Sequence, residues 1–223
     1  MKKGPLRSRA KRGPRVSNES NDRTPRAKGA RRAEVTRKTK ETDIALRLVI
    51  DGTGEYHVDT GIPFFDHLLG AAFRHGFFDV QLKARGDLEV DLHHTVEDVG
   101  IVLGRAFHQA LEGYGGIRRY GHGVVPMTET LTEVAVDLSN RPHFVYNVQI
   151  PARRINQFDL ELVEEFLRAF GSNAQIDLHV NTRYGRNSHH IVESVFKALG
   201  RALDAASRVE PRVRGALSTK GTL

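Results

Sequence analysis

Two short motifs in this chain repeat the same metal-binding residue types, His93-His94-x-x-Glu97 and His189-His190-x-x-Glu193. On a helix, residues i and i+4 share one face, so the first histidine and the glutamate of each motif can bind one ion. The second histidine is rotated by about 100° and faces a different ion. Each motif therefore offers ligands to two metals, and its mixed imidazole and carboxylate donors suit Mn, Fe, Co or Zn.

The repetition extends beyond the two motifs. A single His-His pair at a helix start is usually a capped or solvated end, but at an offset of 96 residues His93–Ala106 aligns with His189–Ala202 with nine identities in fourteen positions. An offset of 98 aligns Asp66-His67 with Glu164-Glu165. Because the two motifs alone leave a pair of six-coordinate ions incompletely ligated, we expect His67 and its counterpart Glu165 to be additional ligands, one per site.

The sequence around the first motif predicts alternating strands and helices. Apolar residues alternate over 44–50 and are followed by Asp51-Gly52-Thr53-Gly54, which indicates a hairpin turn. Residues 78–84 and 88–92 predict two further strands. From about His93 to Leu111, apolar residues recur every three or four positions, which is typical of an amphipathic helix.

The pattern and the repeat together predict an α+β fold made by internal duplication. We expect residues 38–130 and 131–223 to be the two halves of one compact domain, each half a small sheet with helices on one face. No Gly-rich phosphate loop is present, so a dinucleotide-binding fold is not expected.

The basic charge of the chain belongs to its first segment. Residues 1–40 hold 15 Lys and Arg against 3 Asp and Glu, whereas the remaining residues hold 19 against 24. Residues 1–37 are rich in Arg, Pro, Gly and Ser and poor in large apolar residues, so we expect a disordered basic extension. It is interpreted as a solubilising or anion-attracting segment, with an RNA-contacting arm or an organellar transit peptide as alternatives.

Composition also limits the class of protein. The chain has no cysteine, which excludes disulfides, cysteine-ligated zinc and a thiol nucleophile. No apolar run approaches the length needed to cross a bilayer, and the first residues do not form a secretory signal. We therefore expect a cytoplasmic metalloprotein that does not enter a membrane.

Basic residues outside the motifs are candidates for binding an anion. Arginine offers a fork of N–H donors and lysine a point charge, and both are used to recognise phosphate. The candidates are Arg118-Arg119, Arg141 before Pro142, Lys197 and Ser218-Thr219-Lys220-Gly221. Each is a weak signal alone, because arginines at strand ends are usually solvated.

Taken in order, the motifs of this chain resemble those of the imidazoleglycerol-phosphate dehydratases of histidine biosynthesis, from about Lys38 to Leu223. The resemblance is carried by Phe64-Phe65-Asp66-His67, Gly86-Asp87-x3-Asp91-x-His93-His94-x-x-Glu97-Asp98, Arg119-Tyr120-Gly121, Pro126-Met127, Val136-Asp137-Leu138-Ser139-x-Arg141-Pro142, Asn187-x-His189-His190-x-x-Glu193-x-x-Phe196-Lys197 and Ser218-Thr219-Lys220-Gly221.

The resemblance implies an architecture and a set of metal ligands. It implies a duplicated unit like the second domain of ribosomal protein S5, assembled into homo-oligomers of 24 subunits with two Mn²⁺ ions per active site between protomers. The implied ligands are His67, His93, His94, Glu97, His189, His190 and Glu193. Many relatives carry histidine where this chain has Glu165, so that ligand is a departure whose carboxylate would alter the charge and affinity of its ion.

The resemblance also implies the reaction, which is dehydration of imidazole glycerol phosphate, a small phosphorylated substrate, to imidazole acetol phosphate. Two metal ions would bind the substrate as an imidazolate, and a carboxylate, Glu193 or Glu41, would remove the C–H proton. Glu41 and His75 would contact the substrate. The implied phosphate ligands are Arg119, Arg141, Lys197, Ser218 and Lys220.

Two other functions are weaker alternatives. A hydrolase could use the same pair of ions to activate water, although no phosphoesterase or peptidase motif accompanies the metal motifs. A nucleic-acid-binding module driven by the basic extension would show steeply salt-dependent binding that is lost with that extension. The net negative charge of the remaining chain argues against nucleic acid as the main partner.

Overall fold

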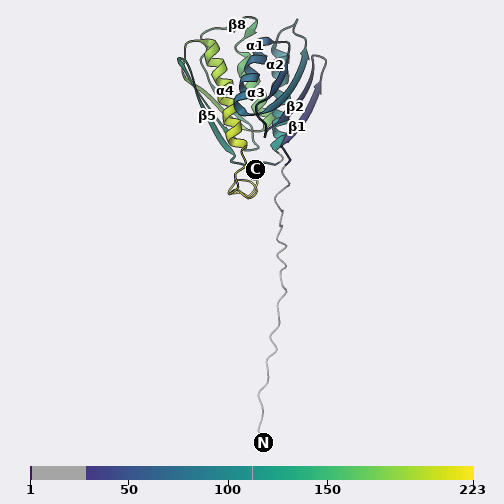
Figure 1. Ribbon diagram of the computed structural model, residues 1–223, viewed down its shortest axis with the longest axis vertical. Coiled ribbons are helices and arrows are strands. Elements are labelled where there is room, and N and C mark those ends of the chain that lie inside the picture. Colours follow the sequence, from purple (N-terminus) through teal and green to yellow (C-terminus); the bar gives the residue numbers. More distant parts are fainter. Residues whose placement is uncertain (2–28, 112) are drawn as a thin grey trace.

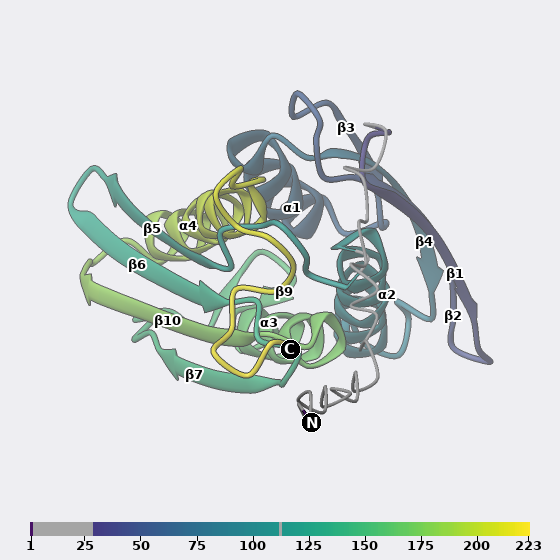
Figure 2. The same cartoon turned by 90° about the horizontal axis from the view of Figure 1, so that it is seen from below.

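The chain folds into two four-stranded sheets with a layer of four helices between them, as Figures 1 and 2 show. The computed structural model describes residue 1, residues 29–111 and residues 113–223. Each sheet presents one face to the helices and the other to the outside (Figure 2). The predicted α+β fold with helices on one face of each sheet is confirmed.

The two sheets have the same topology, which confirms the internal duplication. In the first, the order is β1-β2-β4-β3, with β3 parallel to β4; in the second it is β5-β6-β10-β7, with β7 parallel to β10. The strands are β1 Arg32–Lys38, β2 Thr42–Val49, β3 Tyr56–Asp59, β4 Asp79–Gly86, β5 Tyr120–Met127, β6 Thr130–Asp137, β7 His143–Asn147 and β10 Asp177–Tyr184. A small hairpin, β8 Arg154–Ile155 with β9 Phe158–Asp159, is added to the second half.

Several boundaries predicted from the sequence are wrong. Residues 32–37, expected in the disordered extension, form most of β1, because Ala33 is buried there and β1 pairs along its length with β2. The rest of the extension, apart from Met1 and residues 29–31, lies outside the described residues. The boundary between halves at 130 also fails, since β5 pairs with β6 and belongs to the second sheet.

Two further predictions of local structure are wrong. The turn at 51–54 does not close a hairpin: β2 pairs with β1 and β4, and β3 runs parallel to β4. Residues 88–92 form turns rather than a strand. The strand predicted over 78–84 is confirmed as β4, and the helix predicted over 93–111 is confirmed as α2.

The four helices pack as two parallel pairs, α1 with α4 and α2 with α3. Their bounds are α1 Pro63–Gly76, α2 His93–Leu111, α3 Leu162–Ala174 and α4 Ser188–Ser207. Close approach depends on glycine, because a Cβ on Gly200 would lie 2.1 Å from the carbonyl oxygen of Ala72, and one on Gly104 would lie 2.5 Å from that of Phe170. These equivalent contacts set both pairs in the same register.

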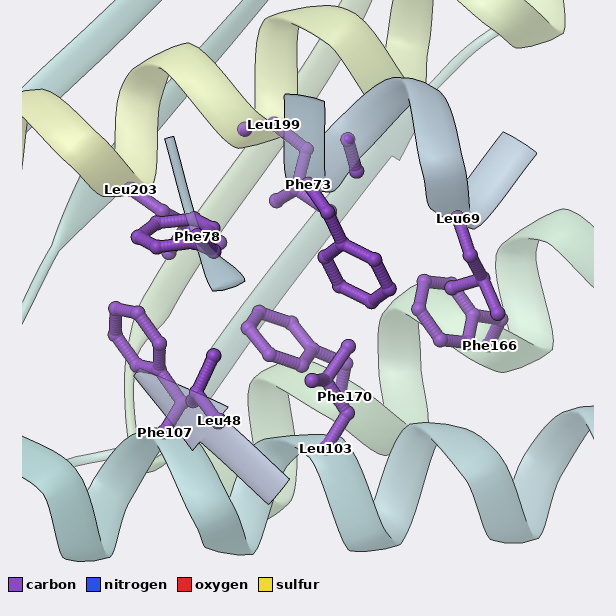
Figure 3. Close-up of a pocket in the computed structure, with 12 residues that line it drawn as sticks. Leu48, Leu69, Phe73, Phe78, Leu103, Phe107, Phe166, Phe170, Leu199 and Leu203 are labelled. Carbon is purple, nitrogen blue, oxygen red and sulfur yellow. The ribbon is translucent and has the colours of Figure 1, made fainter. Parts of the chain in front are cut away.

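The helices enclose an apolar core rich in phenylalanine. Figure 3 shows leucines and phenylalanines from all four helices, with Leu48 from β2 and Phe78, around a void of only about 20 Å³. Phe166 stacks on Phe196 with ring centroids 5.3 Å apart. A void of that size and lining has no polar group to orient a ligand, so it is packing rather than a site. No helix among the described residues is long and apolar enough to cross a membrane.

Candidate metal centre and active site

One cluster of metal-binding side chains is assembled within the single chain. His67 on α1 and His189 and Glu193 on α4 place one donor atom each within 4.8 Å of one another. The Nε2 atoms of His67 and His189 lie 3.3 and 3.0 Å from Oε2 of Glu193. The structure thus brings together three of the side chains that the sequence predicted as ligands, and we call them the α1–α4 cluster.

The spacing and chemistry of the α1–α4 cluster fit a divalent metal ion. Donors that bind one ion at right angles with bonds of about 2.1 Å lie about 3 Å apart, which is close to the distances in the cluster. Burial disfavours the charged form of Glu193, but hydrogen bonds from Lys197 and His67 outweigh it, and the pKa of Glu193 lies below its ordinary value. Its other oxygen, Oε1, is 2.8 Å from Nζ of Lys197. The carboxylate is thus ready to act as a charged ligand.

Local structure explains why these side chains converge. Asn187 is the N-cap of α4, and its side chain accepts hydrogen bonds from the backbone N–H groups of His189 and His190. That cap fixes where the second motif starts on its helix. The tight α1–α4 contact at Gly200 then brings the first turns of α1, with His67, beside the motif.

The first motif is more open. Nε2 of His93 lies 3.8 Å from Oε2 of Glu97, whose side chain is 46% exposed, compared with 11% for Glu193. Among the described residues, no third donor joins this pair within 4.8 Å. Glu165 precedes Phe166, whose carbonyl approaches Gly100 of α2, so α2–α3 packing places it on the helix turn that corresponds to His67. Ile101 stands where the second motif has Lys197.

The second histidine of each motif has its own carboxylate partner. Nδ1 of His94 lies 3.0 Å from Oδ2 of Asp87, and Nδ1 of His190 lies 2.8 Å from Oε2 of Glu129. The hydrogen bond to Asp87 raises the pKa of His94, and the negative charge of Glu41 adds to it. Glu41 therefore belongs to the surroundings of the first motif.

His75 lies near the end of α1 beyond His67. Partial burial lowers the pKa of His75, and the positive charges of Lys197 and Arg201 lower it further. Both cations belong to α4, against which the end of α1 packs where Gly76 meets Gly200. It is exposed, as a residue that contacts substrate must be.

Four of the five predicted phosphate ligands line a single cavity of about 760 Å³: Arg119, Arg141, Ser218 and Lys220. Arg212 and Arg214 line it as well, so it is strongly basic. The guanidinium of Arg119 donates to both carboxylate oxygens of Asp137, at 2.6 and 2.9 Å, and to the carbonyl oxygen of Leu217 at 2.7 Å. Arg119 thereby holds the segment that carries Ser218.

Lys197, the fifth predicted phosphate ligand, is not part of this basic cavity. The backbone N–H of Arg119 donates to the carbonyl oxygen of Ala206, near the end of α4. At about 1.5 Å per helical residue, Ala206 lies about 14 Å from Lys197 and about 24 Å from His190. In Figure 1 the C-terminus, which adjoins the cavity, lies at the opposite end of the molecule from β8. The β8–β9 hairpin lies at the end of the molecule that holds the α1–α4 cluster, because the ring centroid of Phe64 is 5.5 Å from that of Phe158 and 5.3 Å from that of His189.

The family model for imidazoleglycerol-phosphate dehydratase matches residues 60–203, which include both metal motifs. The chain belongs to the imidazoleglycerol-phosphate dehydratase family. Relatives of that name from Pelobacter propionicus and Geobacter sp. strain M21 are 54% and 55% identical to it, and the matches cover 86% and 87% of this chain and 99% and 100% of theirs. It is therefore a hydro-lyase, and the reaction of this family is a dehydration step of histidine biosynthesis.

Solved structures of imidazoleglycerol-phosphate dehydratases share the fold. The enzyme from Staphylococcus aureus matches with a TM-score of 0.72 and 34% identity, over 80% of this chain and 98% of its own. The enzyme from Pyrococcus furiosus, solved in complex with (S)-C348, matches with a TM-score of 0.73 and 34% identity, over 85% of this chain and all of its own. The duplicated architecture is thus that of the family.

Two carboxylates beside the motif histidines of this imidazoleglycerol-phosphate dehydratase family member were not predicted as site residues. Asp87 follows Gly86 shortly before the first motif, but no role was predicted for it. Glu129 was overlooked, although an offset of 88 aligns Glu41-Thr42 with Glu129-Thr130, the equivalent turns between β1 and β2 and between β5 and β6. This shorter repeat was the available signal.

Proposed function

We propose that the chain catalyses metal-dependent dehydration of imidazole glycerol phosphate to imidazole acetol phosphate at a site that holds two Mn²⁺ ions. The observation that supports this most directly is the α1–α4 cluster, in which two imidazoles and a carboxylate converge at ligand spacing. Family membership supports this choice of substrate, and the imidazole and carboxylate donors support metal dependence.

The ligands would come from both motifs and from the helices packed beside them. They are His67, His93, His94, Glu97, Glu165, His189, His190 and Glu193. Bound metal would act as a Lewis acid that holds the substrate ring as imidazolate, which makes loss of the neighbouring hydroxyl possible. The protein side chains orient the ring and keep the reacting carbons close to a base.

Glu41 is better suited than Glu193 to remove the C–H proton. Both oxygens of Glu193 are already engaged, one by Lys197 and the other by His67 and His189. Glu41 is exposed at the end of the β1–β2 turn, near His94. A base needs a free oxygen within reach of its proton, so we assign the base role to Glu41 and the ligand role to Glu193.

The geometry of the single chain supports active sites shared between protomers. Only three carbons separate the imidazole ring of the substrate from its phosphate, whereas the basic cavity and His190 are about 24 Å apart along α4. One substrate cannot contact both within one chain. We propose that the basic cavity of one protomer, with Arg119, Arg141, Ser218 and Lys220, faces the metal ligands of another in a homo-oligomer of 24 subunits. Lys197 and His75 would meet the substrate from the metal side.

Three measurements test the proposal together. Metal analysis of the purified enzyme should find two ions per chain, and the mass of the particle should correspond to 24 chains. The ketone product should form from imidazole glycerol phosphate without release of free phosphate. Release of phosphate would identify a hydrolase instead.

Matched variants then separate the two carboxylates. Glu193→Gln should lose metal and activity together, since it removes a ligand. Glu41→Gln should keep its metal and substrate affinity and lose turnover by about 10²-fold or more, the usual contribution of a general base. If Glu41→Gln kept full turnover, the base would have to be another residue.

The basic extension is not needed for the proposed reaction. Deletion should stop after Gly29, because Arg31 binds Asp51 through both carboxylate oxygens and donates to the carbonyl oxygen of Ser207 at 2.6 Å. Turnover of this truncated enzyme should equal that of the full chain. We also propose a cytoplasmic location, in keeping with a chain that has no cysteine.

A further inference from the structure

The carboxylates beside His94 and His190 determine which nitrogen of each ring is available. A carboxylate accepts hydrogen bonds and does not donate them when ionised, so Nδ1 of His190, 2.8 Å from Glu129, must carry the hydrogen. The lone pair of the neutral ring is then on Nε2. The same holds for His94 beside Asp87, at 3.0 Å. Both rings are set to bind through Nε2.

Glu129 is held in place by the backbone and not by His190 alone. Its Oε1 accepts hydrogen bonds from the backbone N–H groups of Asn187 at 2.7 Å and Arg186 at 3.2 Å, which leaves Oε2 for the ring. Asn187 is also the cap that starts α4. The carboxylate therefore links the β5–β6 turn to the start of the second motif in one fixed orientation.

The duplicated fold shows that this arrangement is particular to the second half. Glu41 occupies the turn that corresponds to Glu129, but His94 donates its Nδ1 hydrogen bond to Asp87, which follows β4. Glu41 thus lies near His94 without being its hydrogen-bonded partner. The two equivalent glutamates have different surroundings: Glu129 accepts four hydrogen bonds, one of them from the hydroxyl of Thr130, whereas Glu41 is exposed.

We propose that Glu129 is a positioning residue of the active site, which fixes the orientation and tautomer of His190 so that Nε2 can bind metal. The inference rests on the proposed metal-dependent function. Partners that orient metal-binding histidines in this way typically contribute 10- to 100-fold to metal affinity.

The decisive variant is Glu129→Gln. It keeps the size of the side chain but replaces one carboxylate oxygen, which accepts hydrogen bonds, with an NH₂ group, which donates them. The backbone N–H groups of Asn187 and Arg186 require an acceptor, so the amide oxygen must face them and the amide NH₂ must face His190. Nδ1 then has to accept, and the hydrogen moves to Nε2, where it blocks metal binding. Glu133→Gln is the matched control, since Glu133 lies on the next strand and pairs only with Arg183 among the described residues.

The measurement is Mn²⁺ affinity of the metal-stripped full-length enzyme, from the electron paramagnetic resonance signal of free Mn²⁺, with thermal unfolding of the metal-free protein alongside. Glu129→Gln should weaken one class of site by about 10- to 100-fold while the metal-free protein unfolds as the wild type does. Glu133→Gln should leave both unchanged, and Glu129→Asp should recover part of the affinity.

The possible results distinguish this inference from the proposed function. If the wild type binds Mn²⁺ and Glu129→Gln binds it equally well, the positioning role is refuted and the proposed function stands. A similar loss of affinity in Glu129→Gln and Glu133→Gln would also refute it. If the wild type binds no metal, both proposals fail.

Discussion

Mixed particles of two inactive variants should regain activity if protomers share their active sites. His189→Ala removes a ligand of the α1–α4 cluster, and Arg141→Ala removes a cation of the basic cavity. The two sites lie at opposite ends of α4, about 24 Å apart by the helical rise, so one protomer cannot supply both to one substrate. Each variant alone should therefore have no intact active site.

The size of the recovery follows from this separation. When the two variants are co-expressed in equal amounts and mix at random, half of the metal parts and half of the phosphate parts are intact. About one quarter of the active sites then combine two intact parts, so the mixed particles should show about a quarter of wild-type activity. If each protomer contained a whole site, every site would carry one defect and no activity would return.

The assay uses particles purified through two different affinity tags, one on each variant, so that only mixed assemblies are measured. A mixture of His189→Ala with Glu193→Gln is the control, because both changes lie in the α1–α4 cluster, so every protomer carries a defective cluster and the mixture should stay inactive. Verified mixed particles of His189→Ala and Arg141→Ala that stayed inactive would refute the shared site and the separation argument with it.

Two further predictions concern stability. Gly200→Ala should destabilise the protein by about 1–3 kcal/mol in urea unfolding and weaken Mn²⁺ binding. Its Cβ would lie 2.1 Å from the carbonyl oxygen of Ala72 and push α1 away from α4. Gly171→Ala is the control and should be neutral or stabilising, because the nearest atom to its Cβ would be 3.5 Å away. Hydrogen bonds from Arg212 lower the pKa of Glu210 to about 2, so this carboxylate stabilises the fold above its unfolded pKa of about 4.5 and ceases to do so as the pH falls towards 2. The difference in melting temperature between wild type and Glu210→Gln should shrink over that range, and a difference that did not change with pH would contradict it.

Helix α2 and the repeated motifs could be predicted from the sequence because their signals are local. Apolar residues recur with the helical period between His93 and Leu111, and nine identities in fourteen positions reveal the duplication. Strand β4 was predicted for the same reason. Local patterns do not show which strands pair with one another. The segment after Ile50 was therefore predicted as a hairpin turn, although β2 pairs with β1.

Strand β1 was missed because its pairing with β2 cannot be seen in its composition. Ala33 and Val35 are the few apolar residues that would indicate a strand within a strongly basic segment. Composition alone assigns such a segment to disorder. Pairing with β2 over seven residues makes it a strand, since backbone hydrogen bonds do not depend on side-chain charge. The composition was read correctly, but the pairing that decides the structure was not visible in it.

Some residues of the candidate site could be predicted from the sequence and others could not. Ligand types and spacing pointed to His67, His189 and Glu193, which the helices do bring together. Arg119 was predicted as a phosphate ligand. In the structure its guanidinium also donates hydrogen bonds to the carboxylate of Asp137 and the carbonyl oxygen of Leu217. Glu129 was missed because its contact with His190 joins a turn to a helix 61 residues away.

The differences between the two halves explain why equal motifs need not act equally. Lys197 engages Glu193 and its counterpart Ile101 cannot, so the second motif is drawn together in one chain while Glu97 remains exposed and 3.8 Å from His93. The preassembled cluster already has three converging donors, and the first motif must obtain its order from elsewhere. A protomer interface that covers the first motif would supply that order, since desolvation strengthens the interaction of its carboxylates with a cation. If protomers share their active sites as proposed, that sharing and the unequal motifs would both follow from divergence of the two halves after duplication.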